Sequence, residues 1–265
     1  MCMKTTIIAF ANNKGGSGKS TGCSCVAAAL SKLNKRVLCV DGDMQLNLTL
    51  SFFNEERAFE FAKSEFNTYT LLTKAADSDK CVRKTEYENI DLIPSSTLMS
   101  GVEYELFAKW QRETILKRAL SKIKESGKYD YILLDAPPTL GCLVMNMLVC
   151  ADRLIIPLEA SPWGLFGLAN MFDFVESVKG INSELSVLGV LVTKVDTRKN
   201  YFKQTLEQLN ELGNVHVFKE VIRQDSAIEW AQDNSKPVVF YKPSSRSSKE
   251  FEAVAQEIVS LCENS

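Results

Sequence analysis

The sequence predicts an α/β fold, a doubly wound and mostly parallel β-sheet with helices on both faces, and three observations lead to it. Short β-branched runs alternate with longer helical stretches along most of the chain. Some strands are apolar without interruption, as in residues 131–134 (Tyr-Ile-Leu-Leu), which indicates burial on both faces and therefore a parallel sheet. A glycine-rich turn at 13–20 joins the first strand to the first helix.

The expected elements follow one another along the chain. Strands are predicted at residues 5–10, 36–40, 90–93, 129–134, 153–157, 185–193 and 215–221. Helices are predicted at residues 19–34, 102–125, 166–178, 201–212 and 248–262. Residues 52–88 are polar, and we expect an irregular, variable excursion there. Because no repeat or low-complexity linker divides the 265 residues, we predict a single domain over residues 1–265.

Composition argues against several classes of protein. The net charge is −2 and the pI about 5.7, so any contact with DNA must come from a local basic patch. We expect no secretory signal at the N-terminus, and no apolar run approaches the ~20 residues that span a bilayer. The 8 cysteines lack metal-ligand spacing, and His216 is the single histidine. A zinc site and a Ser-His-Asp triad are therefore disfavoured, and free thiols in a reducing compartment are expected.

The segment 13–20, Asn-Lys-Gly-Gly-Ser-Gly-Lys-Ser, has the context that a phosphate-binding loop requires. Its glycines let backbone N–H groups converge on an anion at the N-terminus of the following helix. Lys19 can then reach the β- and γ-phosphates, and the Ser20 hydroxyl can bind Mg²⁺. The alternative is a glycine-rich turn that happens to carry a lysine, and the flanking strand and helix argue against it.

Two predicted strands run directly into carboxylates. The strand at 36–40 is followed by Asp-Gly-Asp at 41–43, and residues 131–134 are followed by Asp135. Ligands of doubly wound folds bind at the carboxyl ends of the strands, where an aspartate suits the Walker B role of holding Mg²⁺ through its water shell. Singly, each aspartate could equally be a helix cap or a turn residue. Two such ends beside a phosphate loop favour a nucleotide site.

These motifs resemble those of the ParA/MinD superfamily of deviant Walker A ATPases, and in pattern are closest to its short Soj- and ParA-type partition ATPases. Residues 14–20 are similar to the loop Lys-Gly-Gly-x-Gly-Lys-Ser/Thr. Residues 41–49 resemble Asp-x-Asp-Pro-Gln-x-Asn-x-Thr, and residues 135–141 resemble Asp-x-Pro-Pro-Ser-Leu-Gly. The similarity extends from about residue 4 to about residue 260.

The resemblance implies a Mg²⁺-dependent ATPase and assigns roles to the matching residues. The catalytic residues would be Lys14, which reaches the partner subunit's ATP in a sandwich dimer, Lys19, and Asp43, which positions or activates the attacking water. The implied nucleotide-binding residues are Lys14, Gly15, Gly16, Ser17, Gly18, Lys19, Ser20 and Thr21, with Arg223 and Asp225 as further candidates. The implied Mg²⁺ residues are Ser20, Asp41, Asp43 and Asp135. Judged by itself, Lys14 could also be a solvated loop residue.

Two positions depart from the family pattern. Met44 stands where the family has a proline, which leaves the stiffness of this loop open. Residues 223–225 read Arg-Gln-Asp where the family often has Pro-Arg-Asn, in a loop that contributes to adenine binding.

The resemblance further implies a cytoplasmic, nucleoid-associated partition ATPase. It would dimerise with ATP, bind duplex DNA without sequence specificity, and be released when a ParB-type centromere-binding protein stimulates hydrolysis. Two basic clusters could serve DNA: Arg198, Lys199 and Lys203, preceded by Lys194, and then Lys242, Arg246 and Lys249. Because acidic residues are interspersed, an ordinary solvated surface is the alternative.

Other members of the superfamily must be weighed. A positioning ATPase for a protein cargo shares every motif and stays open. A MinD-like membrane regulator should end in a basic amphipathic helix, whereas residues 252–265 are acidic, so we predict no stable membrane anchor. An iron–sulfur carrier would need paired cysteines, and a tyrosine kinase of this group a C-terminal tyrosine cluster. A nucleotide switch without hydrolysis would lack Lys19 or Asp43, and both are present.

Overall fold

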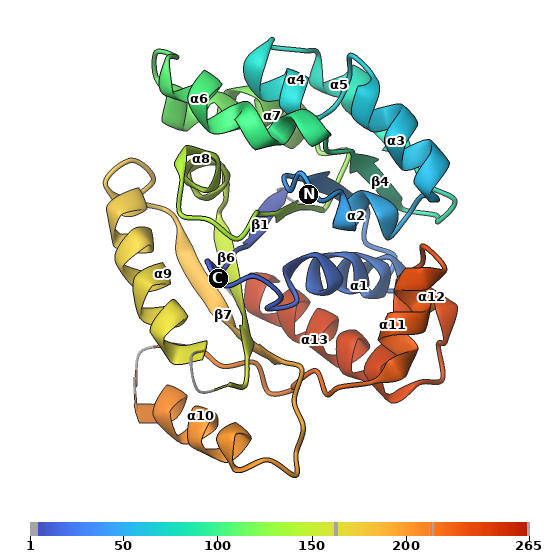
Figure 1. Cartoon of the computed structure of the whole chain (residues 1–265), viewed down its shortest axis with the longest axis vertical. Coiled ribbons are helices and arrows are strands. Elements are labelled where there is room, and N and C mark those ends of the chain that lie inside the picture. Colours follow the sequence, from blue (N-terminus) through green and yellow to red (C-terminus); the bar gives the residue numbers. More distant parts are fainter. Residues whose placement is uncertain (1–4, 162–163, 212, 214, 264–265) are drawn as a thin grey trace.

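The computed structural model describes residues 5–161, 164–211, 213 and 215–263. Its seven-stranded sheet has the order β3-β4-β2-β5-β1-β6-β7. The paired strands are parallel, except that the short β3 runs antiparallel to β4 at one edge. Helices lie on both sides of the sheet (Figure 1). This confirms the predicted doubly wound, mostly parallel α/β fold.

The elements have the following bounds. The strands are β1 (Thr6–Phe10), β2 (Val37–Asp41), β3 (Arg83–Lys84), β4 (Ile90–Ile93), β5 (Tyr131–Asp135), β6 (Arg153–Glu159) and β7 (Ser186–Thr193). The helices are α1 (Lys19–Lys32), α2 (Asn47–Leu50), α3 (Glu55–Lys63), α4 (Thr68–Thr73), α5 (Ser78–Cys81), α6 (Val102–Phe107), α7 (Ile115–Glu125), α8 (Cys142–Cys150), α9 (Gly164–Lys179), α10 (Asn200–Glu211), α11 (Ser226–Asp233), α12 (Val238–Tyr241) and α13 (Arg246–Glu263). Two 3₁₀ turns are η1 (Thr97–Gly101) and η2 (Arg112–Thr114).

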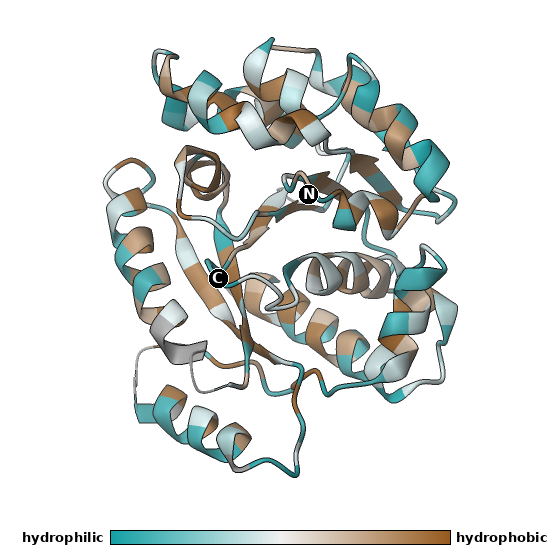
Figure 2. Ribbon diagram, in the orientation of Figure 1, coloured by the Kyte–Doolittle hydropathy of each residue, from teal (hydrophilic) through white to brown (hydrophobic). Residues whose placement is uncertain are grey.

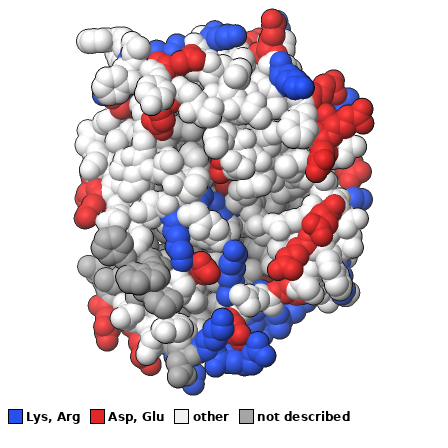
Figure 3. Space-filling view, in the orientation of Figure 1, with Lys and Arg blue, Asp and Glu red and all other residues white. Residues whose placement is uncertain are grey.

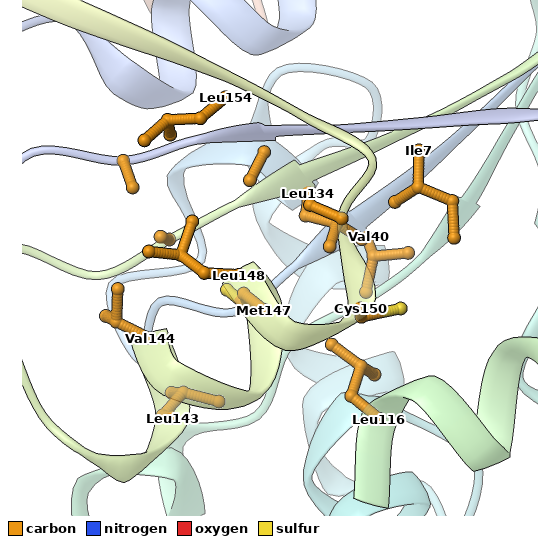
Figure 4. Packing of buried hydrophobic residues seen from close by; sticks show 14 of the residues in the cluster. Ile7, Val40, Leu116, Leu134, Leu143, Val144, Met147, Leu148, Cys150 and Leu154 are labelled. Carbon is orange, nitrogen blue, oxygen red and sulfur yellow. The ribbon is translucent and has the colours of Figure 1, made fainter. Parts of the chain in front are cut away.

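Successive side chains of the central strands enter two hydrophobic cores, one on each face of the sheet. In β1, Ile7 and Ala9 pack in the core beneath α4 and α6 to α9, whereas Ile8 and Phe10 pack beneath α1 and α11 to α13. Figure 2 shows hydrophobic strands between helices that carry polar residues outward, and Figure 4 shows α8 residues packed on the first core. Burial on both faces explains why these strands are apolar without interruption.

The single helix predicted over residues 102–125 is wrong, because the chain breaks it into α6, η2 and α7. Gln111, between the two helices, has a left-handed φ of 50°. The buried Asn146 of α8 holds the break open: its amide donates to the carbonyl of Arg112, and its carbonyl oxygen accepts from the backbone N–H of Leu116. The hydrogen bond between Leu116 and Asn146, which are 30 positions apart in the sequence, thus overrides the local helical pattern.

The expectation that residues 52–88 are irregular is also wrong. They contain α3, α4, α5 and the edge strand β3. The three helices are capped at their N-termini by Asn54, Asn67 and Asp77, whose side chains each accept a hydrogen bond from a first-turn backbone N–H. Such capping residues mark helix starts even where the apolar pattern is weak.

The strand predicted at 215–221 is wrong as well. The segment meets the edge strand β7 at Val190↔Val217, and Val195↔Arg223 is a second isolated bridge. Between the two points, the Lys219 backbone N–H donates to the Glu257 carboxylate of α13, which draws the chain away from the sheet. The last residue predicted for the preceding helix, 212, lies outside the described residues, as do 264 and 265 of the acidic C-terminal segment.

Candidate functional site

The glycine-rich loop connects the end of β1 to the start of α1. Gly16 and Gly18 have left-handed φ values of 73° and 88°, which other residues adopt only with strain. The Thr193 hydroxyl, at the end of β7, donates to the carbonyl of Ser17 over 2.8 Å and fastens the loop from the other side. The N-cap of α1 is Gly18, and within the described chain no side-chain hydrogen bond caps the helix. The first backbone N–H groups of α1 are therefore left for an anion, as a phosphate-binding loop requires.

A cleft of about 890 Å³ opens beside this loop. It is lined by residues 16–22 of the loop and α1, by Asp43 and Pro138 after β2 and β5, by Thr193 and Lys194 at the end of β7, and by most of the segment 222–229. A volume of this size suits a nucleotide, since ligand pockets typically measure about 300–1,000 Å³. The strand ends singled out in the sequence thus do meet at one edge of the sheet.

Lys19 lines the cleft and is buried. Its ammonium group donates a hydrogen bond to the carbonyl of Lys14 over 3.1 Å. Burial lowers the pKa of this lysine, and the negative charges of Asp135 and Asp43 oppose that shift. A desolvated ammonium beside backbone N–H groups is a strong partner for an anion such as phosphate.

Asp135, the last residue of β5, is fully buried. Neither of its carboxylate oxygens accepts a hydrogen bond of normal geometry from the residues that the structure describes, although the Ser20 hydroxyl lies close enough to favour the charged form. Burial, and after it the charge of Asp41, holds its pKa well above the usual range, while Ser20 and Lys19 act in the opposite direction. A buried carboxylate without partners is costly, and a hydrated cation would satisfy it.

Asp41 is engaged within its own loop. Its oxygens accept hydrogen bonds from the Asp43 N–H, from the Thr49 N–H and from the Thr49 hydroxyl, over 3.1, 2.8 and 2.6 Å. Burial raises the pKa of Asp41 to about 6, although these hydrogen bonds favour the charged form. Asp41 thus ties the ends of the segment 41–49 together and leaves Asp43 on the cleft wall.

The neighbourhood of these acids fits a Mg²⁺ ion. No group of three or more His, Cys, Asp or Glu side chains within the described part of the chain is arranged to hold a metal by itself. Mg²⁺ does not need such a group, since it usually keeps several waters and binds through one or two carboxylates plus phosphates. The Ser20 hydroxyl and the two free oxygens of Asp135 are hard ligands of the right kind.

Lys14 points away from this cleft. Its ammonium group donates to the carboxylate of Glu159, the last residue of β6, over 2.9 Å and to the Ser161 hydroxyl, two residues further along the chain, over 2.7 Å. Gly15 beside it has open space around its α-carbon. The sequence did not indicate that Glu159 would pair with Lys14, because 145 residues separate them.

Arg223 and Asp225 both line the cleft and both have partners in their own chain. Arg223 donates from its backbone N–H and its Nε to Glu250. Asp225 caps α11 by accepting from the Ala227 N–H. Nearby, Thr21 accepts a hydrogen bond from Gln232, which the sequence did not single out.

Lys194 is a site residue that the sequence grouped with the first basic cluster. It directly follows β7 and has a left-handed φ of 53°. Its ammonium group lies 3.8 Å from where a β-carbon on Gly16 would stand, and it lines the cleft. The sequence did contain a signal for Lys194, because this residue directly follows a predicted strand and folds of this class bind ligands at strand ends.

Gly42 allows the ends of β2 and β5 to approach each other, and we expect Gly42→Ala to disrupt the site. A β-carbon there would stand 1.9 Å from Met147 Cε and 2.9 Å from the carbonyl oxygen of Asp135, and a rotamer change cannot relieve the contact with backbone. Such overpacking costs about 1–3 kcal/mol. Denaturant unfolding should show this loss of stability together with weaker ATP binding. Gly101→Ala is the matched control because Gly101 has no atom within 4 Å of that position; equal effects of the two changes would contradict the argument.

The six predicted DNA-contacting residues are all exposed. Arg198 is paired with Asp196, Lys249 with Glu252, and Arg246 lies near Glu250. Figure 3 shows Lys and Arg gathered over the lower part of one face, with Asp and Glu among them. Both basic clusters are joined to the segment 222–225 by hydrogen bonds. The Gln224 N–H donates to the carbonyl of Val195, just before the first cluster, and Arg246 of the second cluster donates to the carbonyl of Gln224.

Comparison with known proteins supports a nucleotide site. A family model described as an AAA domain matches residues 5–187. The chain is 36% identical over 253 residues to the sporulation initiation inhibitor protein Soj of Bacillus subtilis (strain 168), covering 95% of this chain and 97% of Soj.

Two solved structures are similar over nearly the whole chain. A putative plasmid partition protein from Borrelia burgdorferi B31, bound to AMPPNP, has 27% identity and a TM-score of 0.83, covering 97% of this chain and 99% of its own. Cobyrinic acid a,c-diamide synthase from Mycobacterium smegmatis, with bound ATP analog and magnesium, has 26% identity and a TM-score of 0.83, covering 96% and 94%. Together with the deviant phosphate loop and the acidic strand ends, these matches show that the chain belongs to the ParA/MinD superfamily, among its Soj- and ParA-type partition ATPases.

Proposed function

We propose that this chain is an ATP-hydrolysing DNA partition protein. With ATP and Mg²⁺ it forms a sandwich dimer that binds duplex DNA without sequence specificity, and a ParB-type centromere-binding partner releases it by stimulating hydrolysis. Residues 1–265 act as one ATPase domain, in the cytoplasm and associated with the nucleoid. Among the helices that the structure describes, none is long and apolar enough to cross a membrane.

The observation that carries the proposal is that one segment, 222–225, takes part in both sites. Its residues line the cleft beside the phosphate loop, and the two basic clusters are attached to it through Val195 and Arg246. A ligand that moves this segment therefore moves the surroundings of both clusters. DNA binding that depends on the nucleotide state follows naturally from such an arrangement.

Within the cleft, the residues act by position and charge. Lys19 binds the β- and γ-phosphates, and Asp43, held by the Asp41 hydrogen bonds, orients the attacking water. Ser20 and Asp135 would hold Mg²⁺, with Asp41 and Asp43 supporting its water shell. When bound, the ion supplies neutralisation of the phosphate charge. The phosphate-binding loop and the start of α1 are completed by Gly15, Gly16, Ser17, Gly18 and Thr21. The adenine base is contacted by Arg223 and Asp225. Lys14 reaches the partner subunit's ATP.

The experiment that tests this function measures binding of the Asp43→Ala protein to non-specific duplex DNA, with ATP and with ADP, over a series of salt concentrations. We expect binding with ATP alone and a steep loss with salt, because log K falls by about 0.9 per log[salt] for each phosphate contacted. Lack of binding in both states, with dimerisation intact, would replace the proposal by a positioning ATPase that acts on a protein cargo or a membrane site.

A charge-removal variant identifies the DNA surface. Lys199, Lys203 and Lys242 are exposed and form no ion pair with any residue that the structure describes. Changing all three to alanine should weaken the binding of DNA. It should also make the slope of log K against log[salt] less steep, by about one unit for each phosphate that the variant no longer neutralises. The control changes three exposed lysines elsewhere to alanine, namely Lys117, Lys122 and Lys179. If both triple variants bind DNA equally weakly, the effect is one of net charge and the assigned surface is wrong.

Lys194 should contribute to nucleotide affinity. Its ammonium lies beside Gly16 at the mouth of the cleft, and no acidic side chain of the described residues pairs with it. We expect Lys194→Met to weaken ATP and ADP binding about 5- to 30-fold, as loss of one charge-assisted hydrogen bond does. Calorimetric titration of the variant beside Lys199→Met measures this, and affinity equal to that of the wild type would remove Lys194 from the site.

A further inference from the structure

The side chain of Lys14 is held at two oxygens of its own subunit. Glu159, the last residue of β6, accepts from its ammonium group over 2.9 Å, and the Ser161 hydroxyl accepts over 2.7 Å. The two charged side chains are 30% and 31% exposed. Lys14 therefore has a defined resting place outside the cleft, built from the strand next to β1.

The backbone of Lys14 is fixed as well. Its N–H donates to the Asn12 side chain over 3.0 Å, and the amide of Asn12 donates to the carbonyl of Pro157 in β6. The carbonyl of Lys14 accepts from the Lys19 ammonium over 3.1 Å. When Lys19 turns to a phosphate, that carbonyl loses its partner. Nucleotide binding and the hold on Lys14 are therefore linked through one residue.

We propose that Glu159 is a positioning residue that keeps Lys14 within its own subunit until a partner's ATP is available. The inference rests on the proposed function, in which Lys14 contacts ATP across a sandwich dimer. In the isolated subunit, Glu159 competes for the same ammonium group. Release of Lys14 from Glu159 is then a step of dimerisation, and Glu159 sets the ATP and protein concentrations at which the dimer forms.

The strength of the pair suits such a role. Partly exposed ion pairs stabilise proteins only slightly, so Lys14 can leave Glu159 without a large penalty. A triphosphate carries more negative charge than one carboxylate and attracts the lysine more strongly. Because two such pairs break for each dimer, a small effect per subunit enters the dimerisation constant twice.

The test compares ATP-dependent dimerisation of variants in an Asp43→Ala background, which keeps ATP intact. Sedimentation velocity over a protein dilution series gives the dimer dissociation constant. We expect Glu159→Gln to tighten the dimer by about 3- to 10-fold, the range set by two weak ion pairs. Ser161→Ala should act in the same direction with a smaller effect, and it keeps the test open if Glu159→Gln fails to fold.

A double-mutant cycle distinguishes this role from a merely structural one. In a Lys14→Ala background, Glu159→Gln should leave the residual dimerisation unchanged, because the group through which Glu159 acts is gone. The control is Glu176→Gln, which breaks the exposed pair with Lys179 and should change nothing.

Two outcomes overturn the inference: dimerisation that is unchanged or weaker in Glu159→Gln, or an equal gain with and without Lys14. If the Asp43→Ala reference protein itself forms no dimer with ATP, the proposed function fails instead.

Discussion

Replacing Lys19 with alanine is expected to abolish nucleotide binding, with the affinity for ATP and ADP falling by more than about 100-fold. Its ammonium group is buried beside the loop and has no other role in the described structure than its bond to the Lys14 carbonyl and its charge opposite Asp135 and Asp43. Without it, the phosphates would lie next to two buried carboxylates and a partial shell of N–H groups. Repulsion between the phosphates and these carboxylates would then outweigh the attraction of the backbone N–H groups of the loop.

Calorimetric titration with ATP and ADP measures the loss. Lys122→Ala is the matched control, since that lysine is exposed and pairs with Asp79 far from the loop in sequence. Thermal unfolding of the nucleotide-free variants should show that Lys19→Ala is folded. Affinity within tenfold of the wild type would show that the loop binds phosphate through its backbone alone, and the role of Lys19 would have to be withdrawn.

The strand ends explain how much of the site the sequence could predict. An apolar strand followed by a polar residue is a local pattern, and it located Asp41, Asp43 and Asp135 at the edge where ligands bind. The same rule applied to β6 and β7 would have indicated Glu159 and Lys194. It was not decisive there, because a lone charged residue after a strand is common, and only the three-dimensional arrangement shows that both lie against the loop.

The fold errors have a similar origin. The periodicity of apolar residues predicted the sheet and most of the helices, since the number of buried faces of an element determines which of its positions are apolar. It could not predict the break between α6 and α7, which depends on Asn146 from a later helix. Nor could it show that the Glu257 carboxylate holds the backbone of Lys219 away from the sheet. Both are contacts between distant parts of the chain, made by polar side chains whose partners the sequence does not specify.

Asp43→Ala is expected to separate binding from hydrolysis. The carboxylate stands on the cleft wall and accepts one hydrogen bond of its loop, from the Gln45 N–H. The other hydrogen bonds that shape the loop go to the Asp41 carboxylate, from the backbone N–H groups of Asp43 and Thr49 and from the Thr49 hydroxyl. Alanine at position 43 keeps its backbone N–H, so the loop and the ATP affinity should survive. The group that orients water is removed, and hydrolysis should fall by about 100- to 10,000-fold, the usual contribution of a positioned acid or base.

Single-turnover hydrolysis and ATP affinity, measured on the same protein, test this separation. Asp43→Asn retains an oxygen that can accept from the Gln45 N–H, as Asp43 does over 3.1 Å, and should be almost as slow as alanine because the charge is gone. Gln45→Ala is the control, since the hydrogen bond from Gln45 to Asp43 comes from its backbone N–H, which alanine keeps, and its rate should stay near that of the wild type. Hydrolysis by Asp43→Ala at the wild-type rate would show that another group orients the attacking water. Asp135, whose carboxylate oxygens are unpartnered among the described residues, would then be the candidate for that role.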